Sequence, residues 1–222
     1  MAALKLVILD CDGVMFSSKE ANRHYYNDLL QAFSRPPMTQ AELDYVHMHN
    51  VATSVRHIFR NYPEIRQEEI DRLCAQTDYS PYLRYMIMEP GLTAFLQDVK
   101  KCGYTAISTN RTDTMDKVLD TFDLRGLFDL VVTASNAPRP KPAPDALYMI
   151  LEHFRLPAEA AIYIGDSKVD EEHCAGTGIA FVGFQNQALK ADYYVDSFTE
   201  LRQLPPVQAM LQTLADSSGG GR

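Results

Sequence analysis

The stretch VILDCDGVMF, residues 7–16, ends a run of three apolar residues on two aspartates. A short continuous apolar run bounded by a turn signal is typical of a strand that is buried on both faces. Asp10 and Asp12 follow this run with one residue between them, and Gly13 completes the turn. We therefore expect the first strand of a parallel sheet to deliver a pair of carboxylates at its carboxyl end.

Similar apolar, β-branched or aromatic segments recur along the chain and alternate with segments of helical periodicity. The predicted strands are residues 4–9, 104–109, 129–134, 161–165, 179–183 and 193–195. The predicted helices between them include residues 91–102, 113–122 and 144–154. This alternation favours the α/β class, with a Rossmann-like doubly wound parallel sheet covered by helices on both faces.

Residues 17–89 interrupt the alternation, because they show helical periodicity and no convincing strand pattern. Helices are predicted for residues 20–34, 40–60, 67–76 and 80–88, the second of them behind a capping box of Thr39 and Glu42. We therefore predict an inserted all-helical cap domain that acts as a lid over the strand ends. The predicted domains are an α/β core of residues 1–16 and 90–215, a cap of residues 17–89 and a disordered tail of residues 216–222.

The composition narrows the classes of partner. The net charge of −8 opposes binding to nucleic acids and anionic membranes. No apolar run approaches the ~18 residues of a membrane-spanning helix, and the N-terminus lacks the features of a signal peptide. The four cysteines are widely separated, without the spacing of a metal site. We expect a cytoplasmic protein, monomeric or homodimeric, that binds neither nucleic acid nor membrane.

Polar side chains follow the other predicted strands at the sheet edge where ligands of parallel sheets bind. Besides Asp10 and Asp12, they are Ser108, Thr109, Asn110, Asp166 and Asp170, with Lys141 in the proline-rich loop RPKPAPD, residues 139–145. Carboxylates brought together raise one another's pKa, and a hard divalent cation such as Mg²⁺ removes that cost. A lysine, a hydroxyl and helix N–H groups can hold phosphate oxygens beside the cation. One aligned carboxylate can then attack phosphorus while another moves a proton.

Four segments carry a resemblance to a known family. DCDGV, AISTN, KPAPDALYMIL and YIGDSKVDEEHCAGTG are similar, in the same order, to the four motifs of the haloacid dehalogenase superfamily of phosphohydrolases. The match covers nearly the whole chain. The helical insert after the first strand resembles the cap of the phosphoglycolate phosphatase and β-phosphoglucomutase branch. Val14, where threonine is commoner, and the segment VHMHNVATSVRHIF, residues 46–59, depart from the usual pattern.

The resemblance implies a role for each aspartate. Asp10 would be the nucleophile and a Mg²⁺ ligand. Asp12 would be the general acid and then the general base, with its backbone carbonyl at the metal. Asp166 would ligate Mg²⁺ directly, and Asp170 would ligate it or orient a metal-bound water.

The resemblance also implies how the phosphoryl group is held. Thr109, with Asn110 beside it, would bind this group, although Ser108 remains an alternative hydroxyl. Lys141 would neutralise the nucleophile and the phosphate. Arg111 could add a further cation, because it adjoins this loop.

Three functions are compatible with these residues. The first is a Mg²⁺-dependent phosphomonoester hydrolase that acts on a small phosphorylated metabolite through an aspartyl-phosphate. The second is a β-phosphoglucomutase-like phosphosugar mutase, and the third is a non-catalytic protein that binds a phosphate ligand. In the cap, His47 and His49 are not on one helix face, which disfavours a metal site there. Cap residues that could contact the leaving group are Arg23, His24, Tyr25, Arg56 and His57.

Overall fold

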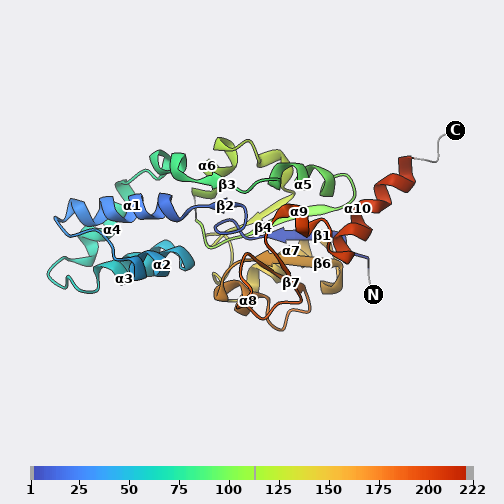
Figure 1. The fold of residues 1–222 in the computed structure, drawn as a ribbon. Helices are drawn as coiled ribbons and strands as arrows, with labels where there is room; N and C mark the ends of the chain where they lie inside the picture. The colour runs from blue at the N-terminus through green and yellow to red at the C-terminus, as the bar shows by residue number, and fades with distance from the viewer. Residues whose placement is uncertain (1–2, 113, 219–222) are drawn as a thin grey trace. The chain divides into compact units, whose positions relative to one another are not determined.

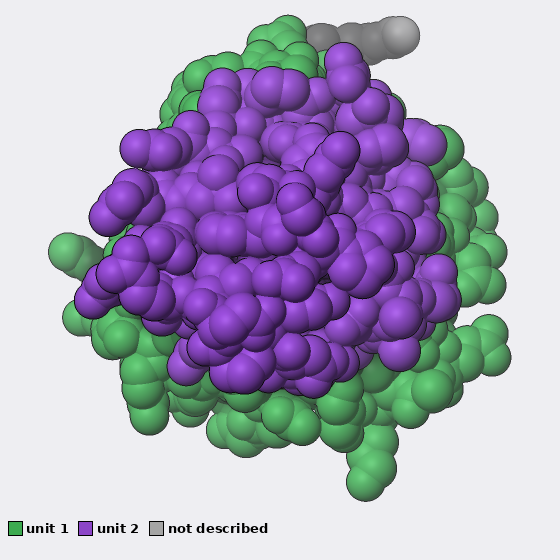
Figure 2. Space-filling view, turned by 90° about the vertical axis from the view of Figure 1, so that its left-hand side faces the viewer, with its two compact units in different colours: residues 1–16, 88–222 green, residues 17–87 purple. Residues whose placement is uncertain are grey.

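The structure is a computed structural model that describes residues 3–112 and 114–218. The chain divides into two compact units, which are coloured separately in Figure 2. The first unit contains residues 1–16 and 88–222, and the second contains residues 17–87. Across the described residues, no helix is both long enough and apolar enough to span a bilayer.

The first unit is built on a six-stranded sheet in the order β5-β4-β1-β6-β7-β8, and every neighbouring pair of strands is parallel. The strands are β1 (Leu6–Leu9), β4 (Tyr104–Ser108), β5 (Leu130–Val132), β6 (Ala161–Gly165), β7 (Ala180–Phe184) and β8 (Tyr193–Val195). All four residues of β1 are buried. The continuous apolar run at the start of the chain is therefore the centre of a parallel sheet, as its sequence predicted.

Helices cover both faces of this sheet, with α5 above it and α8 below it in the view of Figure 1. The helices of the first unit are α5 (Leu92–Val99), α6 (Thr114–Thr121), α7 (Asp145–Phe154), α8 (Lys168–Cys174), α9 (Phe198–Leu201) and α10 (Pro205–Ser218), with short 3₁₀ helices η2 (Arg125–Leu127) and η3 (Ala158–Ala160). One face of the sheet packs Leu6, Ile8 and Tyr163 against Leu147 and Ile150 of α7. The predicted α/β fold class is confirmed.

The register of the sheet decides which strand ends are neighbours. Leu9, the last residue of β1, pairs with Ile107 of β4 on one side and with Ile164 of β6 on the other. The residues that follow these three strands therefore emerge side by side at one edge. Both Asp10 and Asp166 follow strands of this central group.

The second unit is helical. It contains α1 (Lys19–Ala32), α2 (Gln40–Met48), α3 (Val51–Phe59), α4 (Gln67–Gln76) and the 3₁₀ helix η1 (Ser80–Tyr85). Its core is formed by apolar faces, including Leu29 of α1, Leu43 of α2 and Ile58 of α3. The predicted capping box is confirmed, because the Thr39 hydroxyl accepts from the backbone N–H of Glu42 and the Glu42 carboxylate accepts from that of Thr39. The chain crosses between the units at two short paired strands, β2 (Phe16–Ser17) and β3 (Ile87–Met88).

Three segments differ from their predicted secondary structure. Residues 40–60 form two helices rather than one, because His49 has extended backbone angles and Asn50 caps a new helix by accepting from the N–H of Thr53 (3.0 Å). Residues 80–88 form η1 and β3 instead of an α-helix. Residues 216–218, predicted to begin a disordered tail, are the last turn of α10, and residues 219–222 lie outside the described part of the chain.

Candidate active site

The turn after β1 is built around Gly13. Its φ of +83° lies in the left-handed region that favours glycine. A Cβ at this position would lie 2.0 Å from a carboxylate oxygen of Asp166, so the absence of a side chain makes room for that carboxylate. The backbone N–H of Gly13 donates to the carbonyl of Phe16 (2.8 Å), which closes the turn. The two aspartates of the opening stretch are thereby fixed above the end of β1.

Three carboxylates from separate parts of the chain meet at this edge. One oxygen from each of Asp10, Asp166 and Asp170 lies within 4.8 Å of the others. Asp10 and Asp170 are buried and Asp166 is half-buried. The structure thus brings together three of the four aspartates that were expected to surround a metal ion, and Asp12 is not in this cluster.

Lys141 lies between two of these carboxylates. Its Nζ is 2.8 Å from Oδ1 of Asp10 and 2.7 Å from Oδ1 of Asp170. Burial alone lowers the pKa of Lys141, but the two carboxylates outweigh it and raise that pKa. Burial raises the pKa of Asp10 to about 7, although the lysine opposes the rise. Lys141 is therefore a permanent cation that favours the ionised form of the proposed nucleophile.

Asp166 and Asp170 have opposite electrostatic environments. Burial raises the pKa of Asp166 well above its ordinary value, and repulsion from Asp170 and Asp10 adds to the rise. Burial also acts to raise the pKa of Asp170, but the charge and hydrogen bond of Lys141 reverse the direction and lower it. Lys141 also acts to lower the pKa of Asp166, but burial and the neighbouring carboxylates outweigh it there.

Asp170 also receives hydrogen bonds from two residues that the sequence analysis missed. The Tyr163 hydroxyl donates to Oδ1, and the Ser167 hydroxyl donates to Oδ2 (2.6 Å). A tyrosine in an otherwise apolar strand carries a hydroxyl that needs a buried partner, which was the available signal. Ser167 and Asp170 form a capping box at the start of α8, and this motif is also readable from sequence.

The two candidate phosphate-binding hydroxyls at the end of β4, Ser108 and Thr109, have different partners. The Ser108 side chain is fully buried and its Oγ lies 2.9 Å from Nε2 of His173. Nδ1 of the same ring lies 2.6 Å from the carbonyl of Ala143, so the ring joins the end of β4 to the loop after Lys141. The Thr109 hydroxyl accepts from the backbone N–H of Arg111 (3.1 Å). Because Ser108 is held by the core histidine, Thr109 is the better candidate for phosphate.

Arg111 forms an ion pair with Asp12. Nε and Nη2 of the guanidinium lie 2.7 Å from Oδ2 and Oδ1 of the carboxylate, respectively. The arginine side chain is 7% exposed and the aspartate side chain 19%. A bidentate pair fixes the plane of a carboxylate as well as its position.

The charges and the donor set fit a hard divalent cation. The site has four carboxylates, those of Asp10, Asp12, Asp166 and Asp170. When ionised, they carry four negative charges, whereas Lys141 and Arg111 carry two positive charges. A divalent ion would balance the remainder, and carboxylate oxygens are the ligands that Mg²⁺ prefers. The space beside Gly13 admits the Asp166 carboxylate to this cluster.

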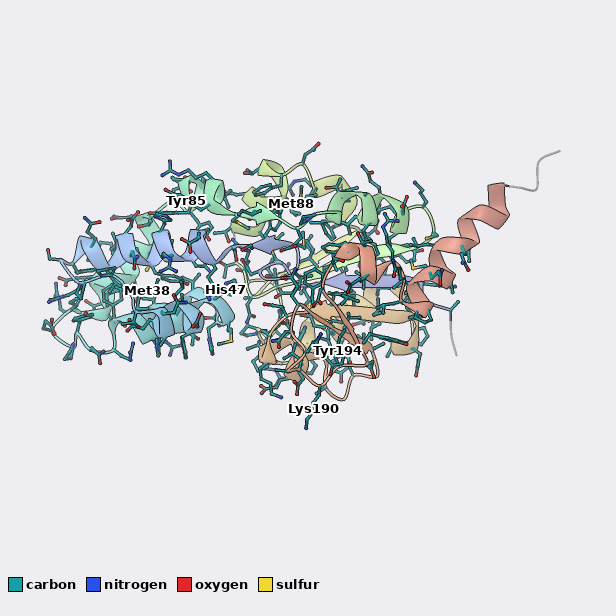
Figure 3. The ribbon with its side chains drawn as sticks, in the orientation of Figure 1. Met38, His47, Tyr85, Met88, Lys190 and Tyr194 are labelled. Atoms are coloured by element: carbon teal, nitrogen blue, oxygen red, sulfur yellow. The ribbon has the colours of Figure 1, made fainter. Side chains whose placement is uncertain are left out.

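The cap residues singled out from sequence have partners within the helical unit. His47, labelled in Figure 3, lies 3.5 Å from the Asn22 amide through its Nδ1. His49 and His57 both stack on the ring of Tyr45, at 4.0 and 3.7 Å between centroids. A further stack joins His24 to Tyr85, also labelled in Figure 3 (3.9 Å). His47 and His49 are thus directed to different neighbours. The other cap candidates were Arg23, Tyr25 and Arg56; Arg23 pairs with Glu20, Tyr25 is buried, and Arg56 bonds the carbonyl of Ala52.

Comparisons with known proteins agree with this geometry. A family model described as haloacid dehalogenase-like hydrolase matches residues 7–184. A phosphoglycolate phosphatase from Rhodobacter capsulatus is 26% identical over 214 residues, which cover 90% of this chain and 95% of that protein. A crystal structure of a haloacid dehalogenase superfamily hydrolase of subfamily IA from Geobacter sulfurreducens has a TM-score of 0.80 and 34% identity, covering 91% of this chain and all (100%) of that one. A β-phosphoglucomutase from Clostridium difficile shares the fold, with a TM-score of 0.80 and 18% identity over 96% of this chain and 99% of its own.

Proposed function

Because the chain belongs to the haloacid dehalogenase-like hydrolase family and is a phosphatase of that family, we propose that it hydrolyses phosphomonoesters of small metabolites with Mg²⁺. The family match across residues 7–184 confirms the resemblance drawn from the four sequence motifs. The substrate class, the metal and the residue roles below are the proposal.

The observation that carries the proposal is the position of Lys141 between Asp10 and Asp170, with Asp166 in the same cluster. A nucleophilic carboxylate must be ionised, and burial alone would protonate Asp10 near neutral pH. The charge of Lys141 opposes this protonation. A cation held by Asp10, Asp166 and the Asp12 carbonyl would lower the pKa of Asp10 further and keep its carboxylate ionised. When bound, Mg²⁺ would also neutralise the charge of the phosphoryl group.

The chemistry assigned to the chain's own residues has two steps. In the first, a carboxylate oxygen of Asp10 bonds to phosphorus as the ester P–O bond breaks, and Asp12 gives its proton to the departing oxygen. In the second, ionised Asp12 takes a proton from water, the water oxygen bonds to phosphorus, and the Asp10–phosphorus bond breaks. The products are an alcohol and inorganic phosphate.

The remaining residues would bind and orient. Thr109 and the backbone N–H of Asn110 would hold phosphoryl oxygens, and Lys141 would neutralise both the nucleophile and the phosphate. Asp170 already accepts bonds from Lys141, Tyr163 and Ser167, which favours orientation of a metal-bound water over direct ligation.

The helical unit would supply substrate selection. The chain enters it at Ser17, soon after Asp10 and Asp12, and leaves it at Ile87. We assign residues 17–89 as a cap that closes over bound substrate and excludes water from the phosphoenzyme. The relatives named phosphoglycolate phosphatases make small phosphorylated acids the first substrates to test.

The test is a phosphate-release assay with Mg²⁺ across phosphoglycolate, sugar phosphates, nucleoside monophosphates and cofactor phosphates. We expect hydrolysis of at least one small ester, and a loss of ~1,000-fold or more in Asp10→Asn with an unchanged circular dichroism spectrum. Ordinary turnover in purified Asp10→Asn would remove Asp10 as the nucleophile. Conversion of β-glucose 1-phosphate to glucose 6-phosphate would indicate a mutase instead, and tight ligand binding without any turnover would indicate a binding protein.

A further inference from the structure

The three consecutive residues after Ser108 make one contact within their own loop and two contacts to other parts of the site. The Thr109 hydroxyl accepts from the backbone N–H of Arg111, the Asn110 amide bonds to the backbone of Lys141, and the Arg111 guanidinium holds Asp12. Arg111 and Asp12 are 99 residues apart in the sequence. The loop after β4 is therefore connected to the turn after β1 through this side-chain pair.

We propose that Arg111 is a positioning residue for Asp12: its guanidinium fixes the carboxylate in the orientation from which it exchanges a proton with substrate and water. This inference rests on the proposed function, because it assigns Asp12 to proton transfer. It replaces the direct phosphate contact that the sequence suggested for Arg111.

The chemistry of the pair permits proton transfer while the contact is kept. A carboxylate offers about four lone-pair positions, and a bidentate arginine occupies two of them, one on each oxygen. The guanidinium leaves the second lone-pair position of each oxygen outside its own two contacts. The proton leaves or arrives at one of these, while the guanidinium fixes the plane of the group.

The burial of the pair supports positioning over an incidental surface contact. Both guanidinium bonds are 2.7 Å long, and the Arg111 side chain is 7% exposed. By contrast, Arg125 makes a similar two-bond pair with Asp120, with side chains 53% and 63% exposed. Exposed pairs contribute little, whereas a buried pair restricts both partners. The Arg125 pair therefore provides a matched control.

The decisive measurement is the dependence of kcat/KM on the leaving group. Dinitrophenolate departs without a proton, whereas an alkoxide needs one from a general acid, whose contribution is ~100-fold or more. We expect Arg111→Ala to lower kcat/KM for phosphoglycolate or glycerol phosphate by ~100-fold and for dinitrophenyl phosphate by less than ~3-fold. The inhibition constant of inorganic phosphate should be unchanged. Arg125→Ala should behave as wild type with both esters.

Two further variants keep the test decisive if Arg111→Ala folds poorly. Arg111→Lys keeps the charge but not the two-point contact, so it should recover activity on alkyl esters only in part. In a double-mutant cycle, Arg111→Lys should add no further loss to Asp12→Asn, because the group it positions is already disabled.

Three results would overturn the proposal. Equal losses for both leaving groups, together with weaker inhibition by phosphate, would place Arg111 on the phosphoryl group. Additive losses in the cycle would separate Arg111 from Asp12. If wild type hydrolyses neither ester nor any other phosphomonoester with Mg²⁺, the proposed function fails and this assignment fails with it.

Discussion

The Asn110 side chain forms hydrogen bonds with both polar backbone groups of Lys141, its N–H and its carbonyl. Its amide oxygen accepts from the lysine N–H (2.9 Å), and its amide nitrogen donates to the lysine carbonyl (3.2 Å). Lys141 in turn lies between Asp10 and Asp170. The amide that follows the proposed phosphate-binding threonine therefore also holds the loop that supplies the buried cation.

Asn110→Ala should lower kcat more than a substitution in another loop that lowers the free energy of unfolding by the same amount. The change leaves two backbone groups of Lys141 without their partner, which costs about 1–3 kcal/mol, and frees the lysine loop. We expect kcat to fall by ~10-fold or more, because Nζ no longer holds its place between the carboxylates. Steady-state kinetics and urea denaturation measure the two effects.

Asn136→Ala is the matched control for that substitution. The Asn136 amide also bonds two backbone groups, the N–H of Thr133 (2.7 Å) and the carbonyl of Val131 (3.2 Å), in an exposed loop. Its loss should lower stability without a change in kcat. A similar fall in kcat in both variants would show that loop destabilisation, and not the placement of Lys141, is responsible.

Asp166→Asn should weaken Mg²⁺ binding by ~10-fold or more, because it removes a carboxylate ligand. Without metal the same variant should melt at a higher temperature than wild type near pH 8. The pKa of Asp166 is raised by burial and by its acidic neighbours, so its ionised form destabilises the folded state. Calorimetric Mg²⁺ titration and melting curves with and without chelator check both effects. Exposed Glu152→Gln is the control, and an unaltered Mg²⁺ affinity in Asp166→Asn would remove Asp166 from the metal site.

Gly13→Ala should destabilise the protein by about 2 kcal/mol or more and weaken Mg²⁺ binding. The new Cβ meets an Asp166 oxygen at 2.0 Å, and the φ of +83° disfavours any side chain. Gly126→Ala is the control, because a Cβ there has no described heavy atom within 4 Å. Chemical denaturation and metal titration of both variants provide the comparison. Equal behaviour of the two would contradict the close approach at Gly13.

His173 should make stability fall as the pH is lowered from about 6.5 to about 4. Burial, with the nearby charge of Lys141, lowers the pKa of His173 from 6.5 to about 4 in the folded protein. Between these values the unfolded chain binds a proton that the folded chain does not, so the free energy of unfolding decreases with falling pH. The full effect is at most about 3 kcal/mol.

The contribution of His173 can be isolated by difference, since several carboxyl groups titrate over the same range. Unfolding free energies of wild type and His173→Gln, measured from pH 8 to pH 4, should converge as the pH falls. His153→Gln, at an exposed position on α7, should run parallel to wild type. Parallel curves for His173→Gln would show that the buried ring is not the source of the pH dependence.

Much of the fold follows from short-range pattern. The run before Asp10 predicted a buried central strand, and residues 161–165 and 193–195 are strands with the predicted bounds. The single helix expected over residues 40–60 was wrong because a polar residue inside an amphipathic pattern, Asn50, can cap a new helix as well as lie on a helix surface.

The sequence by itself determined which carboxylates gather. Asp10 and Asp166 directly follow parallel strands, and Asp170 lies in the first turn of α8, which comes after β6. All such strands end at one edge of the sheet, so strand periodicity and motif order were sufficient. Only the tertiary structure decided which donors outside its own local motif each carboxylate receives: Arg111 for Asp12, Lys141 for Asp10, and Tyr163 for Asp170. These pairings depend on strand order, register and loop path, because a hydrogen bond requires a match within a few tenths of an ångström between residues as much as 99 positions apart. No local pattern in a chain carries that information.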